Sequence, residues 1–407
     1  MDEYVSLLIV TVLAFITPLL FSKSRVPVVV GEILMGLGVG LLSFLVFKIT
    51  GVRVIESGVT VEVLAGIGFI FLMFLSGLEI DFGKLERGGL RTLLKALGML
   101  AVTLGLTYGL ISLVDSTIGF DIDPFYMALI LSTTSVAVVL SIVREMRISR
   151  TVPGQQIMVA ALVADIVTII IIAAYTINIQ VTQSQNFFFG LEAVLIVVMI
   201  GVSFYLIFKL GSLAMWRYPE VLQKFFKLDD PHELGVRGSL AIIFVFVALS
   251  TVINSEALAV LGAFLAGAVI SLLFQEGAML GKKLFGVGYG FLVPIFFINI
   301  GISFDFEAIF SPMVLLIPIL FVIAAVSKVL PAMLFLRSGS IKQDMATGAL
   351  LTGGLTLMIA AAQIGVSLEI ISNTERGMII LLAVIFSAIM PVIFKHLYRK
   401  EDDQCAP

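Results

Sequence analysis

The amino-acid sequence predicts an all-α membrane protein that crosses the bilayer about thirteen times. Composition is the first reason, since hydrophobic residues make up 60% of the 407 residues and charged residues only 13%. Soluble globular domains contain roughly 45–50% apolar and about 25% charged residues. Most of the surface is therefore expected to face lipid. The lengths of the apolar stretches and the placement of the basic residues are the second and third reasons.

The apolar stretches are long enough to span a bilayer, which takes about 20 residues of helix. After the seventh stretch, residues 215–227 mix aromatic and basic side chains. That mixture favours a helix lying on the membrane surface over a plain polar loop. The thirteen candidate spans lie near residues 4–21, 27–47, 61–80, 92–114, 124–143, 153–176, 187–208, 234–253, 257–274, 285–303, 309–336, 345–367 and 376–396.

The basic residues support this count of spans. With the N-terminus outside and the C-terminus in the cytoplasm, 21 of the 25 Lys and Arg residues fall in cytoplasmic segments. Three fall in outer segments and one, Lys328, lies inside a span. Basic residues stay on the cytoplasmic side of membrane proteins, so we expect a multi-pass protein of the cell membrane in this orientation. No nucleic-acid motif occurs, and nucleic acid is not an expected partner.

An odd number of spans suggests two halves of opposite topology joined by a linking helix, a common transporter plan. We expect a single transmembrane domain, with residues 1–176 as the first inverted repeat and 231–397 as the second. Residues 187–230 then form the linker helix and the surface helix, and 398–407 a cytoplasmic tail. A short internal similarity favours this plan, because residues 128–135 and 349–356 occupy corresponding places in the two halves.

Asp165 is the clearest candidate for a functional residue. It lies about halfway along an otherwise apolar span, where a charge costs about 2.5–3.5 kcal/mol on insertion scales. A neutral carboxyl that only holds helices together is one interpretation. The other, which we favour, is an ion site: burial disfavours the charged carboxylate, so the group takes up either a proton or a cation, but not both. That competition is sufficient for exchange.

Other polar residues at membrane depth fall into two clusters and one lysine. Lys328 either extends towards the cytoplasmic surface or points inward to meet helix ends or a carboxylate. Each cluster either packs helices closely or marks a helix that unwinds in the membrane and frees carbonyl groups for ions; we favour unwinding. The clusters are Ser132, Thr133, Thr134 and Ser135 in one half and Thr352, Gly353, Gly354 and Thr356 in the other.

Two glutamates, Glu32 and Glu79, lie near predicted cytoplasmic ends of spans, where a carboxylate can reach the membrane surface. The sequence contains no zinc motif, no nucleotide-binding loop and no nucleophile–base pair at membrane depth. We therefore expect neither an enzyme nor a bound cofactor.

At these residues the chain resembles the cation:proton antiporter family 2, the monovalent cation:proton antiporters of the NapA and Kef type. The ordered set of similar segments spans about residues 20–365. These segments are Val26–Gly36, Phe71–Glu79, Leu131–Val136, Gly262–Gly267, Pro294–Gly301 and Gly353-Gly354.

The resemblance implies a NapA-like antiporter fold, with a dimerisation domain and a six-helix core in which two broken helices cross beside the ion site. By motif, Asp165 is the ion-binding aspartate and binds Na⁺, with Thr133, Thr134 and Ser135 completing the site. Gly353-Gly354 is the second helix break, Lys328 is the basic residue of the core, and Ser132 and Thr352 flank the breaks. The core then moves as a body to expose the site to each side in turn.

One position departs from the family pattern. Electrogenic members have two adjacent aspartates, whereas here Ala164 precedes Asp165. We therefore expect electroneutral, one-for-one exchange of Na⁺, or Li⁺, for H⁺, and Lys328 lacks the partner it has in two-aspartate members. The first cluster reads closer to the Thr-Ala-Thr-Ser of sodium-type members than to the Ser-Ser-Thr of potassium types.

Other functions remain open from the sequence. These are K⁺/H⁺ exchange, a cation channel and sodium-coupled uptake of an organic anion. The expected partners are monovalent cations, protons, the lipid bilayer and a second copy of the chain in a homodimer. Any nucleotide-sensing regulator is expected to be a separate subunit.

Overall fold

The computed structural model is helical throughout the residues that it describes, which are 3–21, 27–51, 58–79, 82–119, 123–149, 151–184, 209, 217, 232–251, 256–273, 278–306, 312–336 and 340–402. The helices are α1 (Glu3–Phe21), α2 (Val28–Thr50), α3 (Val59–Leu78), α4 (Phe82–Ile118), α5 (Pro124–Ser132), α6 (Val136–Glu145), α7 (Val152–Ser184), α10 (Leu234–Thr251), α11 (Glu256–Leu273), α12 (Ala278–Val287), α13 (Val293–Ile302), α14 (Leu316–Phe335), α15 (Ile341–Thr352), α16 (Thr356–Ser367) and α17 (Asn373–Asp402). A π-helical turn, η1 (Gly288–Leu292), connects α12 to α13, and a 3-10 turn, η3 (Pro312–Leu315), precedes α14.

The polytopic, all-α prediction is confirmed, but the count of thirteen spans is not. Within the described residues, eight helices are long and apolar enough to cross a membrane, or nine if the bent pair α15–α16 is one span. The predicted span 187–208 and most of the predicted surface helix 215–227 lie outside the described residues. Each of the other predicted spans overlaps a helix or a pair of consecutive helices. The last helix, α17, continues to Asp402, past the predicted start of the tail.

The chain divides into two compact units, and the first contains Met1–Phe15, Val54–Phe82 and Ala173–Ile300. Its closest helix pair is α3 with α11, where each helix offers a glycine to the backbone of the other. A Cβ atom on Gly77 would overlap the carbonyl of Phe264, and one on Gly267 would overlap the carbonyl of Phe74. Small residues allow membrane helices to approach at this distance.

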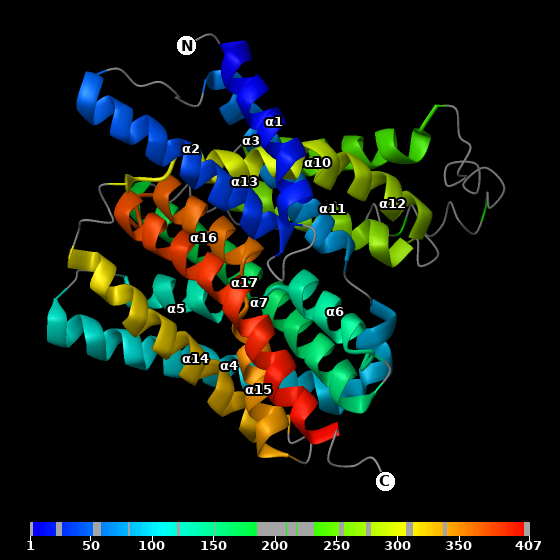
Figure 1. The fold of residues 1–407 in the computed structure, drawn as a ribbon. Coiled ribbons are helices and arrows are strands. Elements are labelled where there is room, and N and C mark those ends of the chain that lie inside the picture. The colour runs from blue at the N-terminus through cyan, green and yellow to red at the C-terminus, as the bar shows by residue number, and fades with distance from the viewer. Residues whose placement is uncertain are drawn as a thin grey trace. The chain divides into compact units, whose positions relative to one another are not determined.

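The second unit contains Ile16–Arg53, Gly83–Ile172 and Gly301–Pro407. Its centre is the group α14, α15, α16 and α17. Figure 1 shows the red α17 running beside the orange α15 and α16. All of the predicted site residues belong to this unit.

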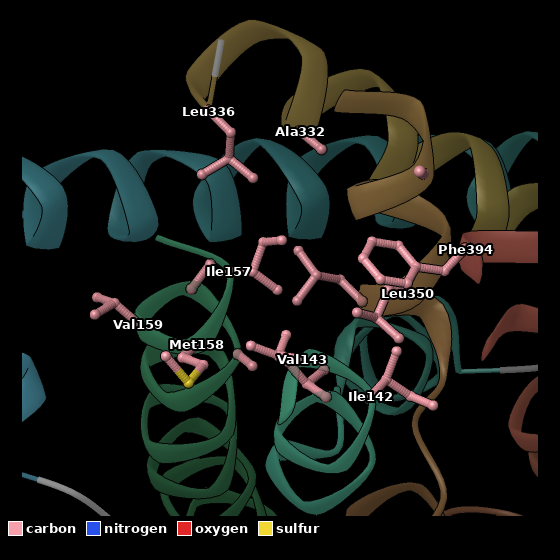
Figure 2. Packing of buried hydrophobic residues seen from close by; sticks show 14 of the residues in the cluster. Ile142, Val143, Ile157, Met158, Val159, Ala332, Leu336, Leu350 and Phe394 are labelled. Carbon is pink, nitrogen blue, oxygen red and sulfur yellow. The ribbon is translucent and has the colours of Figure 1, made fainter. Parts of the chain in front are cut away.

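A hydrophobic core connects several helices of the second unit. Figure 2 shows Val143 of α6, Ile157 of α7, Leu350 of α15 and Phe394 of α17 pointing into one cluster. Each of these four side chains is at most 1% exposed. Burying such a side chain contributes roughly 1.5–3 kcal/mol, so this core holds α6, α7 and α15 in register on one side of the helix breaks.

Candidate functional site

The first predicted helix break lies between α5 and α6. Asp123 caps the start of α5 by accepting hydrogen bonds from the backbone of Phe125 and Tyr126, both 2.9 Å long. The helix ends at Ser132 because Thr133 is extended, with φ −60° and ψ 149°. Thr133 Oγ1 donates to the carbonyl of Ile130 at 2.7 Å. Hydroxyl side chains of this kind satisfy backbone groups outside regular helix, which allows a helix to stop within the membrane.

The second break lies between α15 and α16, which meet at a bend of 42°. Gly353 and Gly354 donate backbone hydrogen bonds to Leu350 at 3.1 Å and to Thr352 at 2.7 Å. The hydroxyl of Thr352 donates to the carbonyl of Gly348 at 2.9 Å. The break thus satisfies part of its own backbone, and the carbonyl of Leu351 stays available to another donor.

The two breaks lie against each other. A Cβ atom on Gly354 would stand 2.9 Å from the carbonyl oxygen of Thr133 and 3.1 Å from its hydroxyl. Such a spacing is tighter than side chains normally adopt, so the close approach explains glycine at this position. Further out, the Tyr126 hydroxyl of α5 donates to the carbonyl of Ala361 in α16 at 2.7 Å. The two broken helices are therefore in contact at the breaks and along one pair of half-helices.

Asp165 projects from α7 to the first break. The residue is buried, with 9% of its surface exposed. Oδ1 accepts a hydrogen bond from Thr134 Oγ1 at 3.0 Å, and Oδ2 accepts one from the backbone N–H of Val136 at 3.3 Å. Thr134 Oγ1 also lies 3.3 Å from the carbonyl of Ala161, one turn earlier in α7. Two donors therefore face the carboxylate, and one of them is the first N–H of α6.

Lys328 projects from α14 and lies between the two breaks, 3% exposed. Its ammonium donates to the carbonyl of Thr133 in the first break and to the carbonyl of Leu351 in the second, the latter at 2.9 Å. Of the two interpretations of this lysine, the inward-pointing one is confirmed, and its partners are helix ends. Ion pairs join Lys283 to Glu233 and Lys395 to Glu145, whereas Lys328 and Asp165 do not form one.

The breaks give the site its electrostatic pattern. The N-terminus of a helix carries about half a positive charge and its C-terminus about half a negative charge. Asp165 faces the N-terminus of α6 at Val136, whereas Lys328 faces the C-terminal ends of α5 and α15. Each charged side chain therefore meets helix ends of opposite sign, and each does so without a charged partner in direct contact.

The structure brings Asp165, Thr133, Thr134, Lys328 and Gly354 together, but not all in the predicted arrangement. Of the three residues expected to complete the site, only Thr134 hydrogen-bonds to Asp165 through its side chain. The carbonyl of Thr133 is taken by Lys328. The hydroxyl of Ser135 accepts from the backbone N–H of Val138 at 3.5 Å and so caps α6.

Ser132 and Thr352 flank the breaks as predicted. Ser132 Oγ is buried and has no hydrogen-bond partner among the described residues, whereas Thr352 bonds within its own helix. Sequence reasoning missed the two backbone contributors, the N–H of Val136 and the carbonyl of Leu351. No side-chain pattern reports them, because their roles depend on where the two breaks meet.

Three comparisons with known proteins agree on the relationship. A family model described as "Sodium/hydrogen exchanger, transmembrane" matches residues 11–400. The chain is 35% identical over 417 residues to the putative Na(+)/H(+) antiporter YjbQ of Bacillus subtilis, covering 98% of this chain and 63% of that protein. It is 29% identical to the probable Na(+)/H(+) antiporter 3 of Methanocaldococcus jannaschii, covering 97% and 96% of the two chains.

A solved structure supports the fold. The sodium proton antiporter MjNhaP1 of Methanocaldococcus jannaschii superposes with a TM-score of 0.62 at 16% identity, over 98% of this chain and 97% of that one. The resemblance to cation:proton antiporters is confirmed, although the family supported is the sodium/hydrogen exchangers rather than the narrower NapA and Kef type. Because the family model covers nearly the whole length, the chain belongs to the sodium/hydrogen exchanger family of transmembrane transporters.

Proposed function

We propose that this protein exchanges Na⁺ for H⁺ across a membrane, with Asp165 holding the two in turn. One observation carries the proposal: Asp165 is a buried carboxylate at the meeting point of two helix breaks, without a direct ion pair. The membrane-length helices and the family support a transport role. The relatives named above carry sodium and proton in their names, which favours Na⁺ over K⁺.

The proposed mechanism is competition for one negative charge. An unpaired carboxylate in a medium of low dielectric is costly, and either a bound proton or a bound cation removes that cost. Hard cations prefer oxygen ligands, and Asp165 with the hydroxyl of Thr134 supplies them. Binding of Na⁺ therefore requires release of the proton, and alternate exposure of the site to the two sides converts this competition into exchange.

We infer a one-for-one, electroneutral stoichiometry. Ala164 stands where two-aspartate relatives have a second carboxylate. One titrating carboxylate carries one proton or one Na⁺ per cycle, so no net charge crosses the membrane.

The direct test is exchange in proteoliposomes that contain a pH-sensitive dye. Addition of Na⁺ or Li⁺ to the wild-type protein is expected to move protons, whereas K⁺ and Rb⁺ do so weakly, and no current accompanies turnover. Asp165→Asn abolishes the response and retains the fold. The matched control is Asp123→Asn, because asparagine also caps a helix N-terminus and Asp123 lies outside the site. Retained exchange in Asp165→Asn would refute the assignment, and a K⁺ response equal to that of Na⁺ would refute the proposed selectivity.

The proposal also covers the membrane, the orientation and the assembly state of the transporter. The distribution of basic residues favours the cell membrane, with the N-terminus outside and the C-terminus in the cytoplasm. The inverted-repeat organisation, a homodimer and a possible separate regulatory subunit are expectations of the same kind. Cysteine labelling from each side and a cross-link between copies would test the orientation and the dimer.

A further inference from the structure

The second unit contains another buried acid that the exchange mechanism does not use. Glu32 is the only acidic residue of α2, a helix long and apolar enough to span the membrane. Its side chain is 4% exposed, and its Oε2 atom is buried with no hydrogen-bond partner among the described residues. Although the sequence places Glu32 near a predicted end of a span, its side chain is enclosed by the protein.

Close packing keeps Glu32 inside the unit. On one side of it, a Cβ atom on Gly31 would stand 2.7 Å from the ring of Phe21 and 3.0 Å from Thr17. On the other side, the backbone of Ile33 lies so close to Gly301 that no Cβ would fit there. The helix therefore cannot rotate or shift to expose the side chain without separating both contacts.

No described group neutralises the charge of Glu32. Among the described residues of this unit, the end of α1, residues 301–306 and α17 lie against α2. Residues 16–21 of α1 have no ionisable side chain. In the second element Asp305 adjoins Phe306, which contacts α2 at Gly40, eight residues and about 12 Å along the helix from Glu32.

The ionisable groups of α17 whose side chains are described lie towards its two ends. At the first end, Glu375 accepts from Ser372, and Arg376 donates to Gln363 and to the carbonyl of Ser303. At the other end, Lys395 pairs with Glu145 at 2.7 Å, and His396 and Tyr398 follow. The ion pairs of the described residues do not include Glu32.

From this geometry we propose that Glu32 is a second proton-binding site, separate from Asp165, and that its occupancy links pH to the conformation of the second unit. Burial without a partner favours the neutral carboxylic acid over the carboxylate. Glu32 is also the fifth residue of its helix, beyond the first turn in which a helix N-terminus stabilises an anion. In this conformation Glu32 holds a proton, and it gives the proton up where water reaches the side chain.

Proton binding at Glu32 makes the conformational equilibrium of the second unit depend on pH. A conformation that holds a proton which the alternative releases is populated more at low pH and less at high pH. As the pH rises, the cost of keeping a proton on Glu32 therefore disfavours this conformation, independently of what occupies Asp165. The binding of a proton at Glu32 does not rest on the proposed exchange, whereas its effect on the pH profile of transport does.

The experiment uses the purified full-length protein and the variant Glu32→Gln, in which the side chain resembles a permanently neutral acid. The control is Glu62→Gln, the same change at an exposed glutamate in the first turn of α3. Infrared difference spectra of wild type against variant at neutral pH are expected to contain the carbonyl band of a protonated carboxyl for Glu32→Gln and none for Glu62→Gln. The proposal is overturned if the difference spectrum of wild type against Glu32→Gln lacks that band.

Two further measurements separate the site from its effect. The thermal unfolding temperature of wild type is expected to fall towards alkaline pH, and to fall less in Glu32→Gln. Equal pH dependence of the unfolding temperature in the two proteins overturns the proposal. In proteoliposomes, Glu32→Gln is expected to exchange Na⁺ for H⁺ with a flatter response on the alkaline side, and an unchanged profile overturns the link to transport. Because the infrared and unfolding measurements need no transport, they stand even where wild type shows no exchange.

Discussion

Replacement of Lys328 by methionine tests whether this lysine holds the two helix breaks together. The variant keeps a side chain of similar length but removes the ammonium that donates to the carbonyls of Thr133 and Leu351. Leu351 lies in the last turn of α15, where carbonyl groups run out of donors within the helix. Both carbonyl groups are then left without their donor in a buried place.

The expected loss of stability is calculated from those two hydrogen bonds. A buried acceptor that loses its partner costs about 1–3 kcal/mol, so two of them cost about 2–6 kcal/mol. The lower part of this range applies, because methionine also removes the cost of burying a charge. We expect Lys328→Met to unfold at a clearly lower temperature in detergent than the wild type. Below that temperature we expect it to retain Na⁺/H⁺ exchange, since in the proposed mechanism the cargo is carried by Asp165.

The neighbouring residue supplies the control. Ser327 is as buried as Lys328, but its hydroxyl donates to Ile323 in its own helix. Ser327→Ala removes a hydrogen bond within one helix, and this bond does not connect separate elements. The substitution is therefore expected to change the unfolding temperature little. The reasoning is refuted if Lys328→Met melts with the wild type, or if Ser327→Ala loses as much as Lys328→Met.

Two further predictions concern the carboxylate and the first unit. Thr134→Val removes the hydroxyl that donates to Asp165, and since a bond to a charged group contributes about 1.5–3 kcal/mol, the KM for Na⁺ in the dye assay is expected to rise about 10- to 100-fold. Thr134→Ser restores it, and an unchanged KM in Thr134→Val contradicts the role. Gly267→Ala would overlap the carbonyl of Phe74 and force α3 from α11, at a cost of about 1–3 kcal/mol. Gly66→Ala on α3 enters open space and is the control for thermal unfolding, so equal melting of the two variants argues against the close crossing.

Much of the fold could be predicted from the sequence because the bilayer imposes a simple rule. Every stretch of about 20 apolar residues must be helical, since lipid offers no partners to the backbone. The two breaks were also predictable, because Ser132–Ser135 and Thr352–Gly354 interrupt apolar runs with residues that satisfy or free the backbone. The sequence also singles out Asp165 by its depth, since an acid in the middle of a span needs a reason, and the structure places it, buried, beside the first break.

The partners within the site could not be predicted in the same way. Lys328 bonds to Thr133, 195 residues earlier, and to Leu351, 23 residues later, through backbone carbonyls. Every residue has a carbonyl, so composition and spacing do not indicate which of them a lysine meets. The environment of Glu32 was hidden for a related reason. Its burial depends on the glycine contacts at Gly31 and Gly301, and these exist only once α2 is packed.

The substitution of Ala164 for a second acid and the partners of Lys328 explain each other. In a site with two carboxylates a lysine can be balanced by one of them, and release of that partner moves a charge. Here the ammonium is stabilised by the C-terminal ends of α5 and α15, which carry only partial charges that stay fixed. These two carbonyl partners of Lys328 stay in place while the occupant of Asp165 changes. On the proposed mechanism, proton and Na⁺ carry the same charge, so the net charge at Asp165 is the same in both loaded states, and we expect one-for-one exchange at that residue.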